Sequence, residues 1–223
     1  MTVRATLAAF VLALALVAGA SASAVGNSYH WHRATTAPAV VTVVDNLPAV
    51  WHPFVLQAAA DYSQALNLDV VVSGPKQCIK SSILSSDTTY PDSTGSAWLS
   101  GILGTNTACI DYHQLDALGG YWGYTFVQTT WTAENGWEIA GAEVFIDPQD
   151  ELISPGLKQW LVCHELGHAM GLEHRPWGDV SCMVNGSDGR AEHQHPGVDD
   201  IAVIDKQTTV WVTPKPTCKR RCR

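Results

Sequence analysis

The sequence predicts an α+β fold in a single domain, and three observations support this prediction. Two runs rich in β-branched residues, at 39–46 and 68–74, have the composition of strands. A segment with helical periodicity separates them, and a hairpin signal follows further along the chain. The 223 residues are 46% hydrophobic and 15% charged, which suits one compact domain with a full core. We find no internal repeat and no linker that would divide it.

The segment 52–67 predicts an amphipathic helix. Pro53 fits the first turn, where its missing N–H is not needed. Apolar residues then recur at helical spacing, at Phe54, Ala58, Tyr62 and Leu66. With the runs on either side, this segment predicts a β-α-β start to the domain.

Further strands are predicted after this unit. The segment 108–113 has the composition of a third strand. The apolar runs 123–131 and 137–147 flank Asn135-Gly136, a dipeptide that favours the tight turn of a β-hairpin.

The N-terminal residues 1–24 predict a signal peptide for secretion. Arg4 precedes an apolar run that ends near Val17, and Ala22 and Ala24 suit signal peptidase. An uncleaved membrane anchor is the alternative, but the apolar run is short for a bilayer span. We therefore expect a secreted, extracellular protein without a membrane segment after cleavage, beginning with a short extension at 25–38.

The chain has an even number of cysteines, six, which in an exported protein indicates disulfides. Six cysteines allow fifteen pairings. Pairs that each bracket one segment are favoured: Cys78 with Cys109, Cys163 with Cys182, and Cys218 with Cys222.

The charge distribution argues against nucleic acid as a partner. The formal charge is −8, and five of the 13 basic residues lie in the tail 214–223. Between the signal peptide and that tail, seven Lys and Arg oppose 21 Asp and Glu, which gives −14. A protein that binds a phosphate backbone needs a basic surface. The tail itself is interpreted as a solvated extension, with contact to an anionic surface as the alternative.

A helix rich in apolar residues on all sides is predicted to begin at Ser154-Pro155, a capping residue followed by proline. Within it, His164 and His168 are four residues apart and share one face. Gly171 can take the left-handed conformation that ends a helix, so His174 approaches from another direction. Three imidazoles that converge in this way leave a fourth tetrahedral position open, which is the pattern of a catalytic zinc ion.

Glu165 follows the first of these histidines directly. A carboxylate at that position can accept a proton from a zinc-bound water and return it to a leaving amine. The motif therefore predicts a zinc-dependent hydrolase.

The run HELGHAMGLEH at 164–174, with Met183 downstream, resembles the metzincin clan of zinc endopeptidases, and most closely its small matrixin-like members. The resemblance implies that His164, His168 and His174 bind Zn²⁺, that Glu165 is the general base, and that Met183 lies in a turn beneath the metal. It also implies a twisted five-stranded mixed sheet with two main helices, a zinc cleft, and a short C-terminal subdomain with one helix at 196–207. The catalytic domain would span 39–213.

The same resemblance implies a protein or peptide substrate that lies along an edge strand at 141–147, and a monomeric enzyme. The chain differs from matrixins in having Arg175 and Asn185 where they commonly have serine and proline. Two other functions stay open: a non-catalytic secreted module that binds a protein partner, and a hydrolase of cell-wall peptides.

Other residues offer weaker candidates for metal sites. A second metal site could use two His-x-His pairs, His30 with His32 and His193 with His195. Calcium could bind two groups of acidic residues, which are Asp147, Asp150 and Glu151, and Asp199 and Asp200. We interpret these acids as surface or helix-start residues.

Overall fold

A computed structural model of the chain describes seven segments: residues 29–33, 35–76, 106–112, 122–132, 136–147, 153–186 and 189–209. Several sequence-based expectations lie outside them. These are the signal peptide 1–24, the tail 214–223, Cys78, Cys218, Cys222, Asp150 and Glu151.

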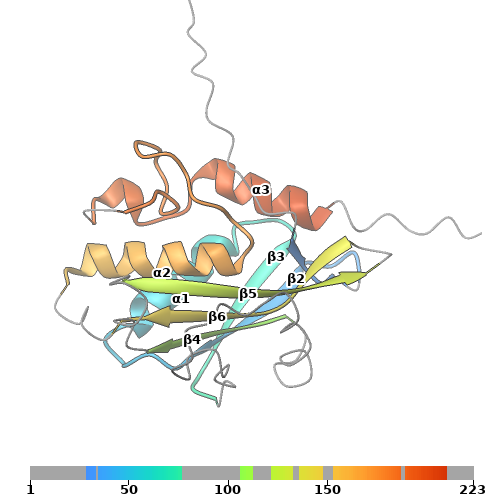
Figure 1. Ribbon diagram of the computed structural model, residues 1–223, viewed down its shortest axis with the longest axis horizontal. Helices are drawn as coiled ribbons and strands as arrows, with labels where there is room; N and C mark the ends of the chain where they lie inside the picture. Colours follow the sequence, from blue (N-terminus) through green and yellow to red (C-terminus); the bar gives the residue numbers. More distant parts are fainter. Residues whose placement is uncertain are drawn as a thin grey trace, which may run out of the picture.

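A mixed sheet forms the base of the molecule (Figure 1). Its parallel strands run in the order β1-β6-β4-β2-β3, and β5 pairs antiparallel with the other side of β6. Their bounds are β1 His30–Trp31, β2 Ala39–Asp45, β3 Leu68–Ser73, β4 Thr107–Tyr112, β5 Gly123–Thr132 and β6 Gly136–Ile146. The sheet is mixed as predicted, but it has six described strands where five were expected. The additional strand is β1, which has only two residues and therefore leaves no periodic pattern in the sequence.

The predicted hairpin is present, since β5 and β6 pair antiparallel up to Thr132 and Gly136, next to the connection between the two strands. The expected edge strand at 141–147 is wrong. Residues of β6 pair with β4 on one side and with β5 on the other, so β6 is internal. No described strand pairs with the outer side of β5, so β5 is an edge of the described sheet.

Helix α1, His52–Tyr62, covers the sheet together with α2. It has proline in its first turn, as predicted, but it ends before Leu66. The hydroxyl of Ser63 lies 2.9 Å from the carbonyl of Ala59 and accepts a hydrogen bond from the N–H of Val70. The chain thus turns into β3 there, and Leu66 is 81% exposed instead of lying on the helical face.

Helix α2, Pro155–Ala169, crosses the sheet beside β5, and α3, Val198–Thr209, lies beyond its C-terminal end next to β1 and β3 (Figure 1). A short 3-10 helix, η5 Ala191–His193, comes between α2 and α3 in the chain. The C-terminal helix is therefore present close to its predicted position.

The core lies between the sheet and the pair α1 and α2. Residues below 2% exposure include large side chains from the strands, from both helices and from the position before α1: Trp31, Trp51, Tyr62, Ile110, Ile139, Ile146, Leu161 and Leu166. Because α2 is buried on most sides, the histidines on it are held by a rigid scaffold.

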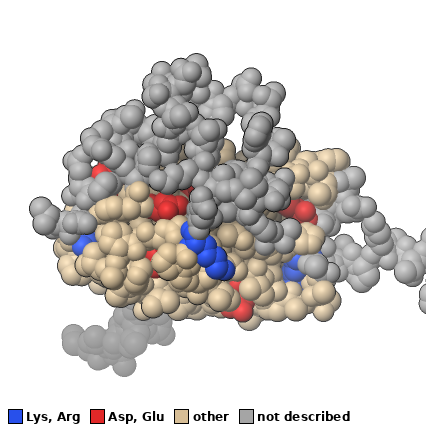
Figure 2. Space-filling view, turned by 90° about the horizontal axis from the view of Figure 1, so that it is seen from below, with Lys and Arg blue, Asp and Glu red and all other residues tan. Residues whose placement is uncertain are grey.

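Among the described residues, no helix is both long and apolar enough to cross a membrane. Figure 2 shows the molecule from below the view of Figure 1. On the part of this face that is not grey, blue and red side chains lie scattered among uncharged ones. The charges visible there are dispersed and form no single patch.

Candidate metal centre

Helix α2 positions the first two histidines. It begins as the sequence predicts, because the Ser154 side chain accepts a hydrogen bond from the N–H of Leu157 and Pro155 occupies the first turn. His164 and His168 follow one turn apart on the same face of the helix.

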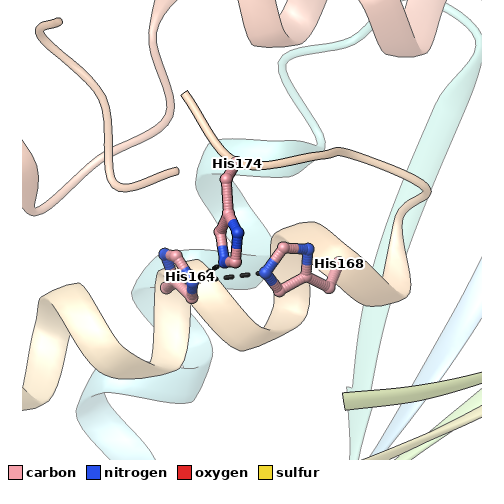
Figure 3. Close-up of side chains that lie close together, drawn as sticks. All are labelled: His164, His168 and His174. Carbon is pink, nitrogen blue, oxygen red and sulfur yellow. Dashed lines mark hydrogen bonds between the residues drawn. The ribbon is translucent and has the colours of Figure 1, made fainter. Parts of the chain in front are cut away.

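The turn after α2 positions the third histidine. Gly171 has a φ of +89°, the left-handed conformation that was expected to end the helix. Beyond it the chain runs back alongside the segment that holds Met183, and the N–H of Arg175 donates to the Met183 carbonyl over 2.7 Å. This places His174 opposite the helix, as Figure 3 shows.

The structure brings the three imidazoles together (Figure 3). Nε2 of His164 lies 3.2 Å from Nε2 of His168 and 3.1 Å from Nε2 of His174. Among the described residues, these three are the one group of His, Cys, Asp and Glu arranged to share a metal ion. Exposure increases from the buried His164 to the exposed His174, so the centre opens to solvent on the His174 side.

Hydrogen bonds to the other ring nitrogens orient two of the imidazoles. Nδ1 of His164 donates to the carbonyl of Cys182, and Nδ1 of His168 donates to that of Leu172, each over 2.8 Å. A neutral imidazole that carries its proton on Nδ1 has a lone pair on Nε2. Both lone pairs therefore point to the centre of the group.

Burial keeps these rings neutral. It lowers the pKa of His164 to about 3, with further contributions from His168 and His174. It also lowers the pKa of His168 to about 4, with a smaller contribution from His174. At neutral pH both are in the unprotonated form that binds metals.

The donor set fits zinc. Zinc bonds to imidazole nitrogen at about 2.0–2.1 Å, so tetrahedral ligands lie about 3.3–3.4 Å from one another. The observed Nε2 separations of 3.1 and 3.2 Å are close to this value. Three nitrogen ligands also leave one position for water or substrate, as in catalytic zinc sites.

The Glu165 carboxylate contacts β5. Its Oε2 lies 2.6 Å from Oγ1 of Thr125, and it is 5% exposed. Burial raises the pKa of Glu165 to about 7, and the hydrogen bond from Thr125 offsets part of that increase. A carboxyl group with a pKa near the working pH is well suited to both accept and release a proton.

Met183 lies in a turn that packs against Gly167 of α2. The predicted disulfide between Cys163 and Cys182 is present and ties that turn to the helix. The hydroxyl of the buried Tyr62 donates to the carbonyl of Cys163 over 2.9 Å and lies 3.6 Å from Sδ of Met183. Cys109 is also disulfide-bonded, and its predicted partner lies outside the described residues.

Three residues of this region were not predicted: Thr125, Arg175 as an ion-pair partner, and Tyr62 as a polar contact of the turn. Arg175 pairs with three aspartates of the C-terminal subdomain, Asp179, Asp199 and Asp200. The sequence gives no local signal for such pairs. Charged side chains are rarely buried without a partner, so the partners of Arg175 follow once its burial is known.

The other candidate residues do not converge on a second site within the described part of the chain. His32 pairs with Glu138, His195 pairs with Asp61, and His193 packs on Trp177. Asp199 and Asp200 lie in the first turn of α3, as expected for helix-start acids.

No protein-family model matches the chain, and no curated protein does. Among solved structures, it is similar to an archaemetzincin from Methanopyrus kandleri, at 16% identity and a TM-score of 0.46, over 79% of this chain and 98% of that one. It is also similar to high choriolytic enzyme 1, a hatching-enzyme zinc protease from the medaka fish Oryzias latipes. That similarity has 11% identity and a TM-score of 0.43, over 81% of this chain and 94% of the enzyme. Both TM-scores are low, so the function of the centre has to be argued from its own residues.

Proposed function

We propose that the chain is a secreted zinc-dependent endopeptidase of the metzincin type. The observation that carries the proposal is the convergence of three imidazole nitrogens beside a buried glutamate, Glu165, which is not one of the three donors. A site that only holds a metal has no need of such a carboxyl group, whereas hydrolysis requires a proton carrier.

His164, His168 and His174 would hold the zinc ion through Nε2. When bound, zinc makes water more acidic and polarises the carbonyl group that is attacked. The carbonyls of Cys182 and Leu172 keep two of the rings in the required tautomer, and such contacts usually strengthen metal binding.

Glu165 would act as the proton carrier. Its buried carboxyl group takes a proton from the attacking water and delivers it to the amine that leaves when the peptide bond breaks. The raised pKa of about 7 supports this role, because the group then exchanges protons readily near neutral pH.

The peptide substrate would lie along β5. This strand packs against α2 and has no described strand on its outer side, so an extended peptide can add to it. We extend the same proposal to secretion, which the N-terminal residues 1–24 and the disulfide between Cys163 and Cys182 support.

The proposal is tested by comparing Glu165→Ala with His168→Ala in zinc content and in cleavage of an unbiased peptide library. Glu165→Ala should keep zinc and lose at least about 100-fold in kcat, because general acid–base transfer alone contributes 10² to 10⁴. His168→Ala should lose zinc, since two ligands hold a tetrahedral ion poorly. Glu192→Ala, a substitution of an exposed glutamate in η5, serves as the control and should leave both unchanged.

Two outcomes would contradict the proposal. If Glu165→Ala cleaves peptides at the parent rate, Glu165 is not the proton carrier. A parent protein that holds zinc but cleaves no peptide favours the non-catalytic binding module. Cleavage of cell-wall peptides alone would keep the chemistry and change the substrate to that of a cell-wall peptide hydrolase.

A further inference from the structure

One hydroxyl group on the edge strand contacts Glu165 twice. Oγ1 of Thr125 lies 2.6 Å from Oε2 of the Glu165 carboxylate and 2.8 Å from the main-chain oxygen of the same residue. Thr125 belongs to β5 and Glu165 to α2, forty positions apart in the sequence. The contact is thus a direct polar link between the edge strand and the proposed proton carrier.

We propose that Thr125 is a positioning residue for catalysis, which holds the Glu165 carboxylate in place from the strand along which the substrate lies. This inference rests on the proposed function and adds to it the residue that orients the carboxylate. A hydrogen bond to a carboxylate is among the stronger ones in proteins, so its loss is expected to affect the orientation of the side chain.

The geometry lets the hydroxyl serve Glu165 before and after it takes up a proton. A threonine hydroxyl has one hydrogen to donate and can also accept. It can donate to the carboxylate, or it can donate to the main-chain oxygen while it accepts a hydrogen bond from the carboxylic acid. Because both acceptors are within reach, neither state leaves a buried polar group without a partner.

Close packing supports the same role. A Cβ atom at Gly123 would lie 2.7 Å from both Cγ and Oε1 of Glu165, so the glutamate side chain fills the space above that glycine. The carboxylate is therefore confined between the backbone of β5 at Gly123 and the hydroxyl at Thr125. A peptide that adds to β5 would bind to the same strand that fixes the proton carrier.

Two substitutions at Thr125 separate the hydroxyl from the shape of the side chain. Thr125→Val keeps the branched shape and removes the hydroxyl, whereas Thr125→Ser keeps the hydroxyl and removes a methyl group. Thr130→Val makes the same change at an exposed position on the same strand and serves as the control. Each protein is measured, zinc-loaded, for kcat and KM on a peptide substrate, for zinc content, and for thermal midpoint, and each is crystallised.

Thr125→Val should lower kcat by about 10- to 100-fold with KM changed by less than about 3-fold, which corresponds to one hydrogen bond to a charged group. Zinc content should not change, and the crystal structure should show the Glu165 carboxylate displaced. Thr125→Ser should restore kcat to within about 3-fold of the parent, and Thr130→Val should match the parent.

Two results would overturn the inference. A Thr125→Val enzyme with parental kcat shows that the hydroxyl positions nothing, and a Thr125→Ser enzyme as slow as Thr125→Val shows that packing alone matters. If the parent cleaves no peptide, the proposed function is wrong, but the positioning of Glu165 by Thr125 can still be tested with the crystal structures. An undisplaced carboxylate in Thr125→Val would then count against it.

Discussion

Nη1 of Arg175 lies 3.2 Å from Oδ1 of Asp200, and both side chains are buried. Arg175 directly follows the third histidine of the metal centre, and Asp200 lies in the first turn of α3. The other oxygen of Asp200 accepts from the hydroxyl of Ser181 over 2.5 Å, and Ser181 in turn accepts from the N–H of Met183. One buried network therefore connects the segment that follows His174, the turn that holds Met183 and the C-terminal helix.

We predict that Arg175→Met destabilises the protein by about 3–5 kcal/mol, because it leaves the carboxylate of Asp200 buried without the opposite charge of the guanidinium group. The affinity for zinc should fall too, since the segment that carries His174 is no longer fixed. Urea unfolding and a zinc competition assay measure the two effects. Arg190→Met is the control, because its ion pair with Glu192 is exposed and should contribute less than about 1 kcal/mol. Equal stability of the two variants would exclude the network as a support of the fold.

Gly167→Ala should destabilise the protein although alanine is the better helix former. Helix propensity alone favours alanine over glycine by about 1 kcal/mol. At this position, however, a Cβ atom would overlap Sδ of Met183 and the hydroxyl of Tyr62. Overpacking in a close-packed core typically costs 1–3 kcal/mol, and here it would displace the turn that holds Met183.

The check on this prediction is the sign of the change in unfolding free energy, together with zinc content. Gly74→Ala provides the control, because no atom lies within 4 Å of the added Cβ there. An increase in stability for Gly167→Ala would mean that the turn that holds Met183 moves aside easily and is not tightly packed against α2.

The convergence of the three histidines was predictable from the sequence because its signals are local. The cap at Ser154, the spacing of His164 and His168, and the left-handed Gly171 all act within one helix and its end. The hairpin was predictable for the same reason, since Asn135-Gly136 is a local hairpin signal that can be read without reference to the rest of the chain.

What the sequence did not predict depends on contacts between distant segments. The edge position of β5 depends on the order of the strands in the sheet, and no single segment of the sequence determines that order. Thr125 and Glu165, and likewise Arg175 and Asp200, meet only after α2 and α3 have docked. β1 has two residues, too few to show the alternating pattern of a strand in the sequence. The structure shows that it belongs to the fold, because its Trp31 lies in the hydrophobic core.

Trp31 carries the next prediction, because it connects the N-terminal segment to the C-terminal end of α2. It is 1% exposed, and its Nε1 donates to the carbonyl of Ala169 over 3.1 Å. Trp31→Ala should cost about 3–5 kcal/mol, the usual range for removing a large buried aromatic side chain. Trp131→Ala, at a tryptophan that is 59% exposed, should change stability far less.

Denaturant unfolding of both tryptophan variants decides this point. If Trp31→Ala were no more harmful than Trp131→Ala, the residues before β2 would be a dispensable extension, as the boundary at residue 39 implied. The expected difference would instead make β1 a part of the folded domain.

The last prediction concerns pH and the zinc-free protein. Burial lowers the pKa of His30, of His164 to about 3 and of His168 to about 4. In the unfolded chain these groups take up protons near pH 6.5, and in the folded protein only at lower pH. As pH falls below about 6.5 the unfolded state therefore binds more protons, and the free energy of unfolding decreases.

Glu165 acts in the opposite direction. Burial raises its pKa to about 7, so between pH 7 and its ordinary value near 4.5 the folded protein holds a proton that the unfolded chain lacks. This contribution increases stability as pH falls through that window, but one glutamate opposes three histidines, and the net effect should be a loss. Glu165→Gln removes the opposing contribution, so its stability should decrease more steeply than that of the parent between pH 7 and 5. Urea unfolding of both chelator-treated proteins at several pH values measures the two slopes. A slope for Glu165→Gln no steeper than that of the parent would show that this carboxyl group takes up no additional proton in the folded protein in that range.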